Sequence, residues 1–370
     1  MSRPPARVLL VSPYALSVPG GVQSQVAATA RELAHRGIEV AVCSPGAADM
    51  SLVAAGVVHV ARGAILPIPA NGSRAPVTLS WRAAQVFAGR AASMRDGVVH
   101  VHEPFAPVAA YAVLHQHRAP TVATFHRGGG GPAYVVGRPL IHRLSRGIDV
   151  STAVSNVAAE TIHAAAGIDS SVLFNGFEVD RIRGAAPAPS TDPTILFVGR
   201  HEPRKGLRVL LEALALVDRP LRCWVVGDGP ETDELRRRHG SDERIEWLGA
   251  VDDDEKFAGL SGADILCVPS LGGESFGLVP LEGMAAGTAV IASDIPGYRE
   301  ATAGHAMLVP PGDVTALAAA LDQLLADPPG SGALDAARAH AAAWSIPALV
   351  DRLVEAYAEA VDRFAAAGAK

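Results

Sequence analysis

Two successive series of short apolar segments, each followed by a polar loop and a segment of helical pattern, most restrict how this chain can fold. Short apolar runs that alternate with helical segments are typical of buried strands in parallel sheets. In the first series the predicted strands are residues 7–12, 38–43, 97–102, 121–125 and 149–154. In the second series they are residues 194–199, 222–227, 245–248, 264–270 and 289–293. The sequence therefore predicts an α/β fold with two Rossmann-like, doubly wound domains that face a cleft.

The length of the chain also favours two domains, because 370 residues are more than one core usually serves. We expect an N-terminal domain over residues 1–180, a linker rich in proline and alanine over 181–193, and a C-terminal domain over 194–345. A long helical segment that begins at residue 346 is predicted to cross back, so that residues 346–370 join the first domain.

No stretch reaches 18 uninterrupted apolar residues, so no membrane span is expected. The apolar patch near the N-terminus is too short for a signal peptide and is interpreted as the first strand, which predicts a cytoplasmic protein. Cys43, Cys223 and Cys267 lie in apolar strand-like runs without pairing or metal-ligand spacing. We interpret them as core residues in a reducing compartment.

Residues 272–287 (GGESFGLVPLEGMAAG) follow a predicted strand with a glycine-rich loop and a helix expected to begin near Ser275. Gly272, Gly273 and Gly277 would let the backbone turn sharply and approach a ligand. The first N–H groups of the helix would then face an anion such as a phosphate. The sequence therefore predicts an anion site at this loop.

Glu274 and Glu282 frame this loop with seven residues between them. Near a bound phosphate, a carboxylate is suited to accept hydrogen bonds from neutral hydroxyls. A nucleotide sugar carries a hydroxyl-rich ring on each side of its diphosphate and would supply them. The alternative is an ordinary strand-to-helix turn, with Glu274 stabilising the helix dipole and Glu282 on a solvated face.

Further polar residues follow other predicted strands, where ligands bind in open parallel sheets. Arg200 and Lys205 follow the first strand of the second series and carry the charge to stabilise a diphosphate leaving group, or else belong to a solvated loop. His126 closes a strand of the first series and is the candidate for a group acting at the reacting carbon, with a structural role as the alternative. His100 and His102 share one face of a strand, and we expect packing for His100 and a place at the cleft edge for His102.

Two other site types are disfavoured. The loop after the first strand has only Gly20 and Gly21 where a dinucleotide fingerprint needs G-x-G-x-x-G, which argues against a nicotinamide dehydrogenase. Residues 252–254 (DDD) open a helical segment, where acidic side chains are expected, so they are not interpreted as a metal site.

One block of the sequence is basic although the net charge is −6. Residues 61–148 contain ten arginines and only Asp96 and Glu103 as acids. Three of its basic residues are spaced to line one helix face, namely Arg138, His142 and Arg146. We expect an anionic partner and prefer a membrane surface or lipid phosphate; no nucleic acid is expected, because no nucleic-acid-binding module is evident.

Taken together, these segments resemble family 4 retaining glycosyltransferases of the GT-B fold. The resemblance runs over nearly the whole chain, through residues 19–23 (PGGVQ), 102–104 (HEP), 123–126 (ATFH), 199–206 (GRHEPRKG) and the two framing glutamates. Within that family the sequence is most similar to bacterial phosphatidylinositol mannosyltransferases, through PGGVQS, PIPANGS at residues 67–73, GGESFG and LEGMAAGTAV.

The resemblance implies transfer of a hexose, mannose from GDP-mannose, to a hydroxyl of a phosphatidylinositol-type lipid at the inner face of the cell membrane, with no cofactor and no metal. It implies donor-binding roles for Gly21, Arg200, Lys205, Val251, Asp253, Lys256, Glu274, Ser275, Phe276, Gly277, Leu278 and Glu282. It implies acceptor-binding roles for Tyr14, Gln23, Asn71 and Arg127. The implied catalytic groups are His126, Arg200, Lys205 and Glu274, with Glu274 on the mannose hydroxyls and Glu282 on the ribose.

The sequence departs from that closer group in the segments expected near the acceptor. Ala70 stands where a Tyr is expected, Ser17 where an Asp is expected, and Arg127 with four glycines replaces a Thr/Ser/Lys segment. Donor base and acceptor therefore stay open. The alternatives are a UDP-sugar-dependent transferase acting on another lipid or soluble acceptor, a nucleotide-sugar epimerase, and a non-catalytic protein that binds a nucleotide sugar or anionic lipid.

Overall fold

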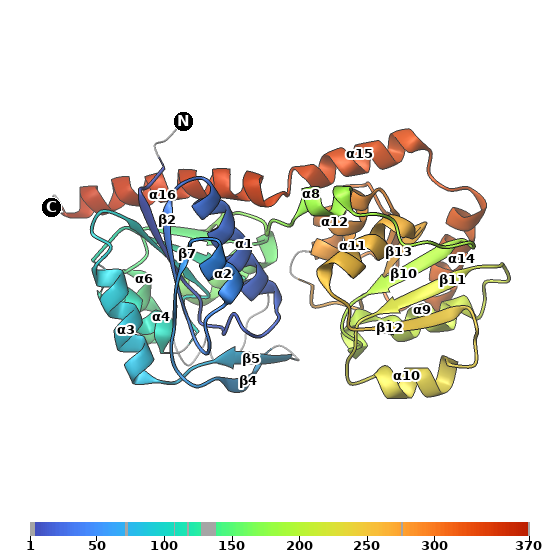
Figure 1. Cartoon of the computed structure of the whole chain (residues 1–370), viewed down its shortest axis with the longest axis horizontal. Helices are drawn as coiled ribbons and strands as arrows, with labels where there is room; N and C mark the ends of the chain where they lie inside the picture. Colours follow the sequence, from blue (N-terminus) through green and yellow to red (C-terminus); the bar gives the residue numbers. More distant parts are fainter. Residues whose placement is uncertain are drawn as a thin grey trace. The chain divides into compact units, whose positions relative to one another are not determined.

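The computed structural model describes residues 4–70, 73–106, 108–116, 118–126, 138–274 and 277–368. The chain divides into two compact units (Figure 1). Unit 1 joins Met1–Gly176 to Ile346–Lys370, and unit 2 is Phe177–Ser345. Unit 2 thus begins before the expected linker, since helix α8 (Val179–Gly184) contacts α11 (Asp253–Gly262) and α12 (Leu278–Ala286) of that unit.

The described residues of unit 1 form a parallel seven-stranded sheet in the order β3-β2-β1-β6-β7-β8-β9. Its strands are β1 (Arg7–Val11), β2 (Glu39–Ser44), β3 (Val58–Ala61), β6 (Val98–His102), β7 (Thr121–Phe125), β8 (Val150–Ala153) and β9 (Ser171–Val172). The strand order reverses between β1 and β6, which is where open α/β sheets bind ligands.

An antiparallel hairpin, β4 (Leu66–Ala70) and β5 (Ser73–Val77), lies outside this sheet. The sequence did not predict these strands, because prolines within LPIPA and SRAPV argue against a ladder position.

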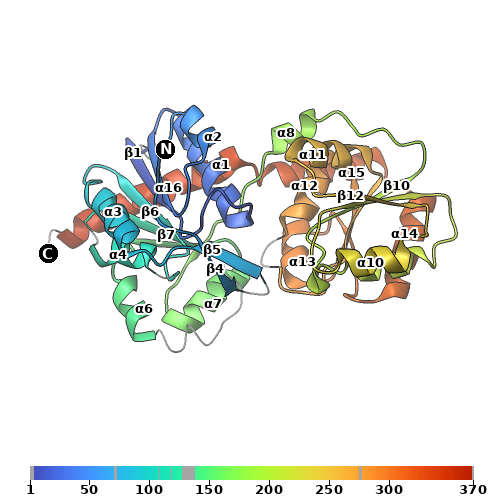
Figure 2. The same cartoon turned by 60° about the horizontal axis from the view of Figure 1, so that its bottom comes forward.

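Helices cover both faces of the sheet in unit 1. They are α1 (Gly21–His35), α2 (Met50–Ala54), α3 (Trp81–Ala92), α4 (Ala109–Gln116), α6 (Arg138–Ser145), α7 (Asn156–Ala166) and α16 (Ile346–Gly368). Phe87 of α3 and Val113 of α4 pack against Leu9 of β1 in one core cluster. In the opposite cluster, Leu33 of α1 and Leu353 of α16 pack with Leu10. In both views α16 lies beside α1 (Figures 1 and 2).

The predicted return of the last helix to the first domain is confirmed. Ile346, Val350, Leu353, Tyr357 and Ala360 recur at intervals of three or four residues, so they fall on one face of α16. All five side chains are buried in unit 1. Tertiary packing of this apolar face, more than helix propensity, therefore holds α16 in place.

The described residues of unit 2 form a parallel six-stranded sheet in the order β12-β11-β10-β13-β14-β15. Its strands are β10 (Thr194–Val198), β11 (Arg222–Val226), β12 (Ile245–Gly249), β13 (Ile265–Val268), β14 (Ala289–Ser293) and β15 (Met307–Val309). Its further helices are η1 (Pro203–Lys205), α9 (Leu207–Leu214), α10 (Thr232–His239), α11 (Asp253–Gly262), α12 (Leu278–Ala286), α13 (Pro296–Thr302), α14 (Val314–Ala326) and α15 (Ser331–Ala342). The order reverses between β10 and β13.

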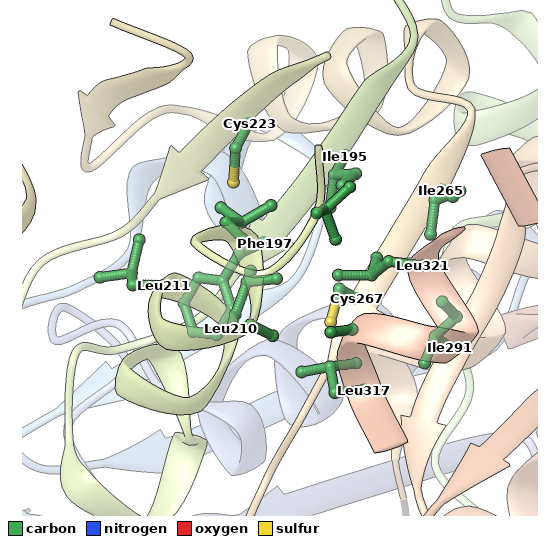
Figure 3. Packing of buried hydrophobic residues seen from close by; sticks show 14 of the residues in the cluster. Ile195, Phe197, Leu210, Leu211, Cys223, Ile265, Cys267, Ile291, Leu317 and Leu321 are labelled. Carbon is green, nitrogen blue, oxygen red and sulfur yellow. The ribbon is translucent and has the colours of Figure 1, made fainter. Parts of the chain in front are cut away.

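The core of unit 2 lies between its sheet and helices α9 and α14. Phe197 of β10 is enclosed with Leu210 of α9, and Leu317 and Leu321 of α14 approach Cys267 of β13 (Figure 3). Because this core fills the face of the sheet, it fixes where the strands end and so where their loops emerge.

The three cysteines are buried and free, as the sequence predicted. Burial raises the pKa of the Cys43 and Cys223 thiols to about 12. These thiols are therefore protonated packing groups at neutral pH.

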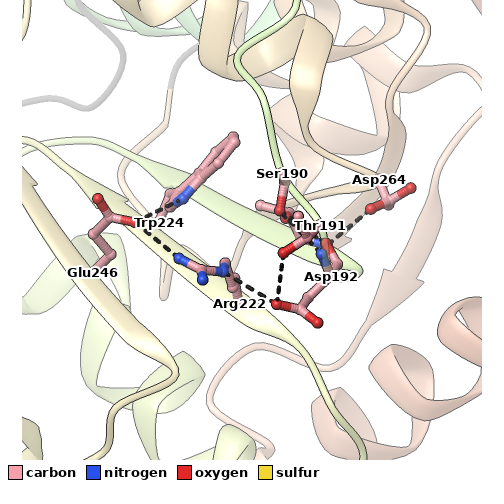
Figure 4. Close-up of polar contacts among 8 residues, drawn as sticks. Ser190, Thr191, Asp192, Arg222, Trp224, Glu246 and Asp264 are labelled. Carbon is pink, nitrogen blue, oxygen red and sulfur yellow. Dashed lines mark hydrogen bonds and ion pairs between the residues drawn. The ribbon is translucent and has the colours of Figure 1, made fainter.

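A network of polar side chains lies at the amino-terminal edge of the sheet in unit 2 (Figure 4). The Thr194 N–H donates to Asp264 Oδ2 at 2.8 Å, and Arg222 Nε donates to Asp192 Oδ2 at 3.3 Å. These groups satisfy one another within the unit. Ligand chemistry is therefore expected at the carboxyl edge of the sheet.

The packing of α16 generates a stability prediction. Leu353→Ala is expected to cost about 2–5 kcal/mol of unfolding free energy, because the side chain is 3% exposed and its removal leaves a cavity. Val361→Ala on the same helix is the matched control, since Val361 is 41% exposed. Denaturant unfolding of the two variants measures the difference, and equal effects would mean that α16 is not held by its buried face.

Candidate functional site

In unit 2 the loops that follow β10 and β13 are held together by their backbones. The Leu271 N–H donates to the Arg204 carbonyl at 2.7 Å. Gly206 lies at φ +71°, and a Cβ there would collide with the Pro269 carbonyl oxygen. Only glycine fits so close an approach in this conformation. Two loops far apart in the sequence thus meet at the point where the strand order reverses.

An alternating series of acidic and basic side chains runs across these loops. Glu274 Oε1 lies 2.8 Å from Arg204 Nη1 and 2.7 Å from Lys205 Nζ. Glu202 Oε2 accepts from Arg204 Nε at 3.0 Å, and Glu202 Oε1 pairs with Arg200 Nε at 3.0 Å. The three cations exceed the two carboxylates, and Arg200, with 62% of its side chain exposed, is the most accessible of the five.

The predicted helix after the glycine loop begins later than expected. Helix α12 begins at Leu278, with Gly277 as its N-cap at φ +107°, and not near Ser275. A Cβ on Gly277 would lie 2.7 Å from the buried Tyr298 ring. Tyr298 in turn shares a 2.8 Å hydrogen bond with Ser270, which follows β13. Tyr298 therefore packs against the end of the loop, where only glycine leaves room for its ring.

Glu282 lies on α12 and is buried, so the solvated face considered for it is wrong. Its Oε1 accepts from Lys256 Nζ of α11 at 3.0 Å. Burial raises the pKa of Glu282 and outweighs the opposing effect of Lys256. Burial alone would lower the pKa of Lys256, but the Glu282 charge raises it overall. The structure thus pairs two residues for which the resemblance implies donor-binding roles.

The neighbouring acidic run has the helix-opening role that the sequence predicted. Asp252 caps α11 by accepting from the Glu255 N–H at 2.9 Å, and Glu255 completes the capping box. Val251 precedes this cap, and Asp253 is the first residue of the helix and lies 3.5 Å from Lys256 Nζ. Among the described residues, no group of three or more His, Cys, Asp or Glu side chains is placed to hold a metal ion.

In unit 1 the structure describes two of the expected acceptor residues, Tyr14 and Gln23, which both follow β1 in the chain. Gly21 opens α1, and Gln23 is buried in its first turn. A Cβ on Gly20 would lie 2.5 Å from Gln23 Oε1, so glycine makes room for that amide. Tyr14 forms a β-bridge to Val77. Asn71, Arg127, Ser275 and Phe276 lie outside the described residues.

His126 is fixed by two neighbours at the carboxyl ends of β6 and β7. Its backbone N–H donates to Glu103 Oε1 at 2.7 Å, and its Nε2 shares a 2.9 Å hydrogen bond with His102 Nδ1. Glu103 takes the uncommon positive φ of +46°. Sequence reasoning placed His102 at the edge of a cleft, whereas the structure shows it 3% exposed beside His126.

Burial lowers the pKa of both His126 and His100 to about 3. Burial, with the nearby His100 and His126, lowers the pKa of His102 well below its usual value. All three rings are therefore neutral at pH 7. A neutral imidazole donates or accepts a hydrogen bond but supplies no positive charge.

Two residues of the site were not singled out from the sequence. Glu202 could have been recognised from the sequence, because it lies two residues from both Arg200 and Arg204. Tyr298 gave no signal, since its contact with Gly277 exists only in the folded chain.

The helix face predicted for the basic block is confirmed only in part. Helix α6 ends at Ser145, so Arg146 lies beyond the helix whose face it was predicted to share with His142. None of the described helices combines the length and hydropathy that a membrane-spanning helix requires.

Two parallel, doubly wound sheets, with polar loops at the strand reversals, define the GT-B class of glycosyltransferases. Residues 19–181 match the family described as Glycosyltransferase Family 4, and residues 192–327 match Glycosyl transferases group 1. The phosphatidyl-myo-inositol mannosyltransferase of Mycobacterium leprae is 39% identical over 337 residues, covering 86% of this chain and 87% of the relative. The protein of the same name from Mycolicibacterium smegmatis is 38% identical over 354 residues, covering 92% and 91%. The chain belongs to glycosyltransferase family 4.

Solved structures agree with this fold. A glycosyltransferase from Rickettsia africae is similar with a TM-score of 0.77 and 23% identity, covering 96% of this chain and 99% of that chain. Anabaena HepE in complex with UDP gives a TM-score of 0.76 at 19% identity, covering 94% and 98%. At these identities the likeness concerns the fold alone.

The buried histidines generate a pH prediction. The unfolded chain binds protons at these residues below pH 6.5, and the folded chain does not, so stability should fall as the pH drops. Between pH 7 and 5.5 the loss should be about 1 kcal/mol for each neutral buried histidine. His100→Asn should remove one such contribution. Denaturant unfolding at both pH values measures this, and an unchanged pH dependence in the variant would contradict it.

Proposed function

We propose that this protein is a retaining mannosyltransferase that moves mannose from GDP-mannose to a hydroxyl of a phosphatidylinositol-type lipid. The observation that carries the proposal is the Arg200–Glu202–Arg204–Glu274–Lys205 series at the strand reversal of unit 2. The relatives named phosphatidyl-myo-inositol mannosyltransferase support the choice of mannose as the sugar and of a phosphatidylinositol-type acceptor.

The charged series suits a diphosphate leaving group. Arg200 and Lys205, together with the amino terminus of α12, would stabilise the negative charge that grows as the sugar departs. Protein cations do this work, so the proposal requires no divalent metal. Glu274 Oε1 already accepts from Arg204 and Lys205, and we assign its Oε2 to the mannose hydroxyls.

The transfer proceeds by attack on the face from which GDP leaves. The bond between the anomeric carbon and the phosphate oxygen breaks, and the acceptor oxygen bonds to the same face. The acceptor proton passes to the departing phosphate. His126, neutral and held through its backbone and Nε2, would hydrogen-bond the transferred sugar rather than act as an acid.

The direct test measures transfer of radiolabelled mannose from GDP-mannose to phosphatidylinositol vesicles, with EDTA present. Labelled lipid that retains the α-linkage supports the proposal. Transfer only from a UDP sugar, donor conversion without an acceptor, or binding without turnover would assign the chain to one of the other functions considered. Loss of activity in EDTA that Mg²⁺ restores would overturn the metal-free mechanism.

Arg200→Ala should lower kcat/KM. The expected loss of transition-state stabilisation is at least about 2 kcal/mol, because the protein loses a cation that stabilises the leaving group. Arg219→Ala is the control, because Arg219 is an exposed arginine of the same unit that pairs with Asp322 at 2.7 Å. Steady-state kinetics with varied donor measure both variants. Equal kcat/KM values for Arg200→Ala and the unmodified protein would remove Arg200 from the site.

We also propose that helix α3 binds the surface of an anionic membrane. Trp81 and Val86 are 64% and 42% exposed on this helix, and Arg82 and Arg90 are exposed beside them. Exposed apolar side chains interleaved with cations suit the boundary between headgroups and acyl chains.

Co-sedimentation should increase with the fraction of anionic lipid in the vesicles and decrease with salt. Trp81→Ala should weaken it, whereas Leu216→Ala, at a residue 59% exposed in unit 2, should not. Vesicle binding that depends neither on lipid charge nor on salt, and that is unchanged in Trp81→Ala, would contradict this role for α3.

A further inference from the structure

A cluster of buried polar side chains lies inside unit 1, between the sheet and helices α1 and α16. His100 and His102 of β6 stack with ring centroids 4.3 Å apart, and His126 follows β7. These rings line a cavity of about 20 Å³ together with Gln25 and Thr29 of α1. Burying three neutral histidines costs free energy of folding unless their ring nitrogens form hydrogen bonds.

Both nitrogens of His100 are used, and the direction of each hydrogen bond follows from a backbone carbonyl. Thr152 Oγ1 donates to the Ala123 carbonyl at 3.2 Å, so the Thr124 hydroxyl must donate to Thr152 Oγ1 at 2.7 Å. Thr124 Oγ1 then accepts from His100 Nε2 at 2.7 Å. His100 Nδ1 is left as the acceptor for the Tyr357 hydroxyl of α16 at 2.9 Å. His100 is thus a structural link between α16 and the strands.

His102 differs from His100 in its partners. Its Nδ1 bonds only to His126 Nε2 at 2.9 Å within the described part of the chain. There, His102 Nε2 and His126 Nδ1 are buried without a hydrogen-bond partner. A buried imidazole with one unused nitrogen destabilises the fold relative to a well-packed apolar side chain. Packing alone therefore does not explain a histidine at residue 102, whereas its hydrogen bond to His126 does.

We propose that His102 is a positioning residue that orients the His126 ring and occupies its Nε2, which leaves Nδ1 as the one ring nitrogen of His126 without a hydrogen-bond partner among the described residues. Glu103 holds the backbone of His126 at 2.7 Å, and His102 holds the ring. The two contacts together fix both ends of the residue. This inference rests on the proposed role of His126 in sugar transfer.

Two substitutions at residue 102 test the proposal. His102→Leu removes the hydrogen bond, and kcat should fall about tenfold or more, because a misoriented group loses its catalytic effect. The donor KM should change little, since the charged series of unit 2 is untouched. His102→Asn places an amide near the position of Nδ1 and should restore most of the lost kcat.

His100→Leu is the matched control. It removes an equally buried imidazole from the same strand face and the same cavity, but it leaves the His102 bond to His126 in place. It should lower stability more than His102→Leu, because Thr124 and Tyr357 lose a hydrogen-bond partner, while kcat stays near that of the unmodified protein. Unfolding curves verify that each variant is folded under assay conditions.

A second readout does not depend on activity. Histidine ¹⁵N chemical shifts report which ring nitrogen carries the proton, and a selectively labelled protein should show His126 in a single neutral tautomer at pH 7. His102→Leu should shift or broaden the His126 signals, and His100→Leu should leave them unchanged.

The outcomes separate this inference from the proposed function. If the unmodified protein transfers no sugar, the proposed function fails and the inference fails with it. If it transfers sugar and His126→Ala impairs transfer, but His102→Leu keeps full kcat, only the inference fails. Equal losses of kcat in His100→Leu and His102→Leu would also overturn it, because a general disturbance of the cavity would then explain both. A loss confined to His102→Leu, with recovery in His102→Asn, supports it.

Discussion

The candidate donor site depends on the close approach of two backbone loops in unit 2. The loop after β10 contacts the loop after β13 only because Gly206 has no side chain, since a Cβ there would clash with the Pro269 carbonyl oxygen. That approach brings Arg204 and Lys205 to one oxygen of Glu274. Without it, the cations after β10 would be a solvated basic loop. The charged series is thus a consequence of sheet topology and one glycine.

Ionisable side chains are buried in both units, but their charge states differ. In unit 2, carboxylates and cations satisfy one another at the sheet edge, and Lys256 and Glu282 do the same between α11 and α12. In unit 1, burial keeps three histidines neutral, so they act through hydrogen bonds. In the proposed mechanism, stabilisation of charge and orientation of the sugar are therefore assigned to different elements.

The sequence predicted the central strands closely, because buried parallel strands are continuous apolar runs. Strands β7 and β14 match the predicted residues, and α16 packs on unit 1 as expected. The hairpin β4–β5 was missed because its prolines contradict strand propensity. Helix α12 begins later than predicted, since three glycines in one loop leave the first helical residue undetermined by local pattern.

The candidate site could be predicted as a set of residues but not as a set of partners. Arg200, Lys205, Glu274 and Glu282 follow strands, and strand ends are visible in the sequence. That Glu282 pairs with Lys256, or that Glu202 links two arginines, depends on contacts between separate elements. The same holds for the bond between His102 and His126, which joins neighbouring strands.

The central claim is that the charged loops of unit 2 bind the diphosphate of a GDP sugar. Thermal unfolding with GDP, UDP, ADP and their sugars tests it most directly, because a ligand that binds the native state raises the midpoint by mass action. The account predicts a shift that is specific for GDP, larger with GDP-mannose, and lost in Lys205→Met. A shift specific for UDP would contradict the mannose assignment, and the absence of any nucleotide-dependent shift would contradict the donor site itself.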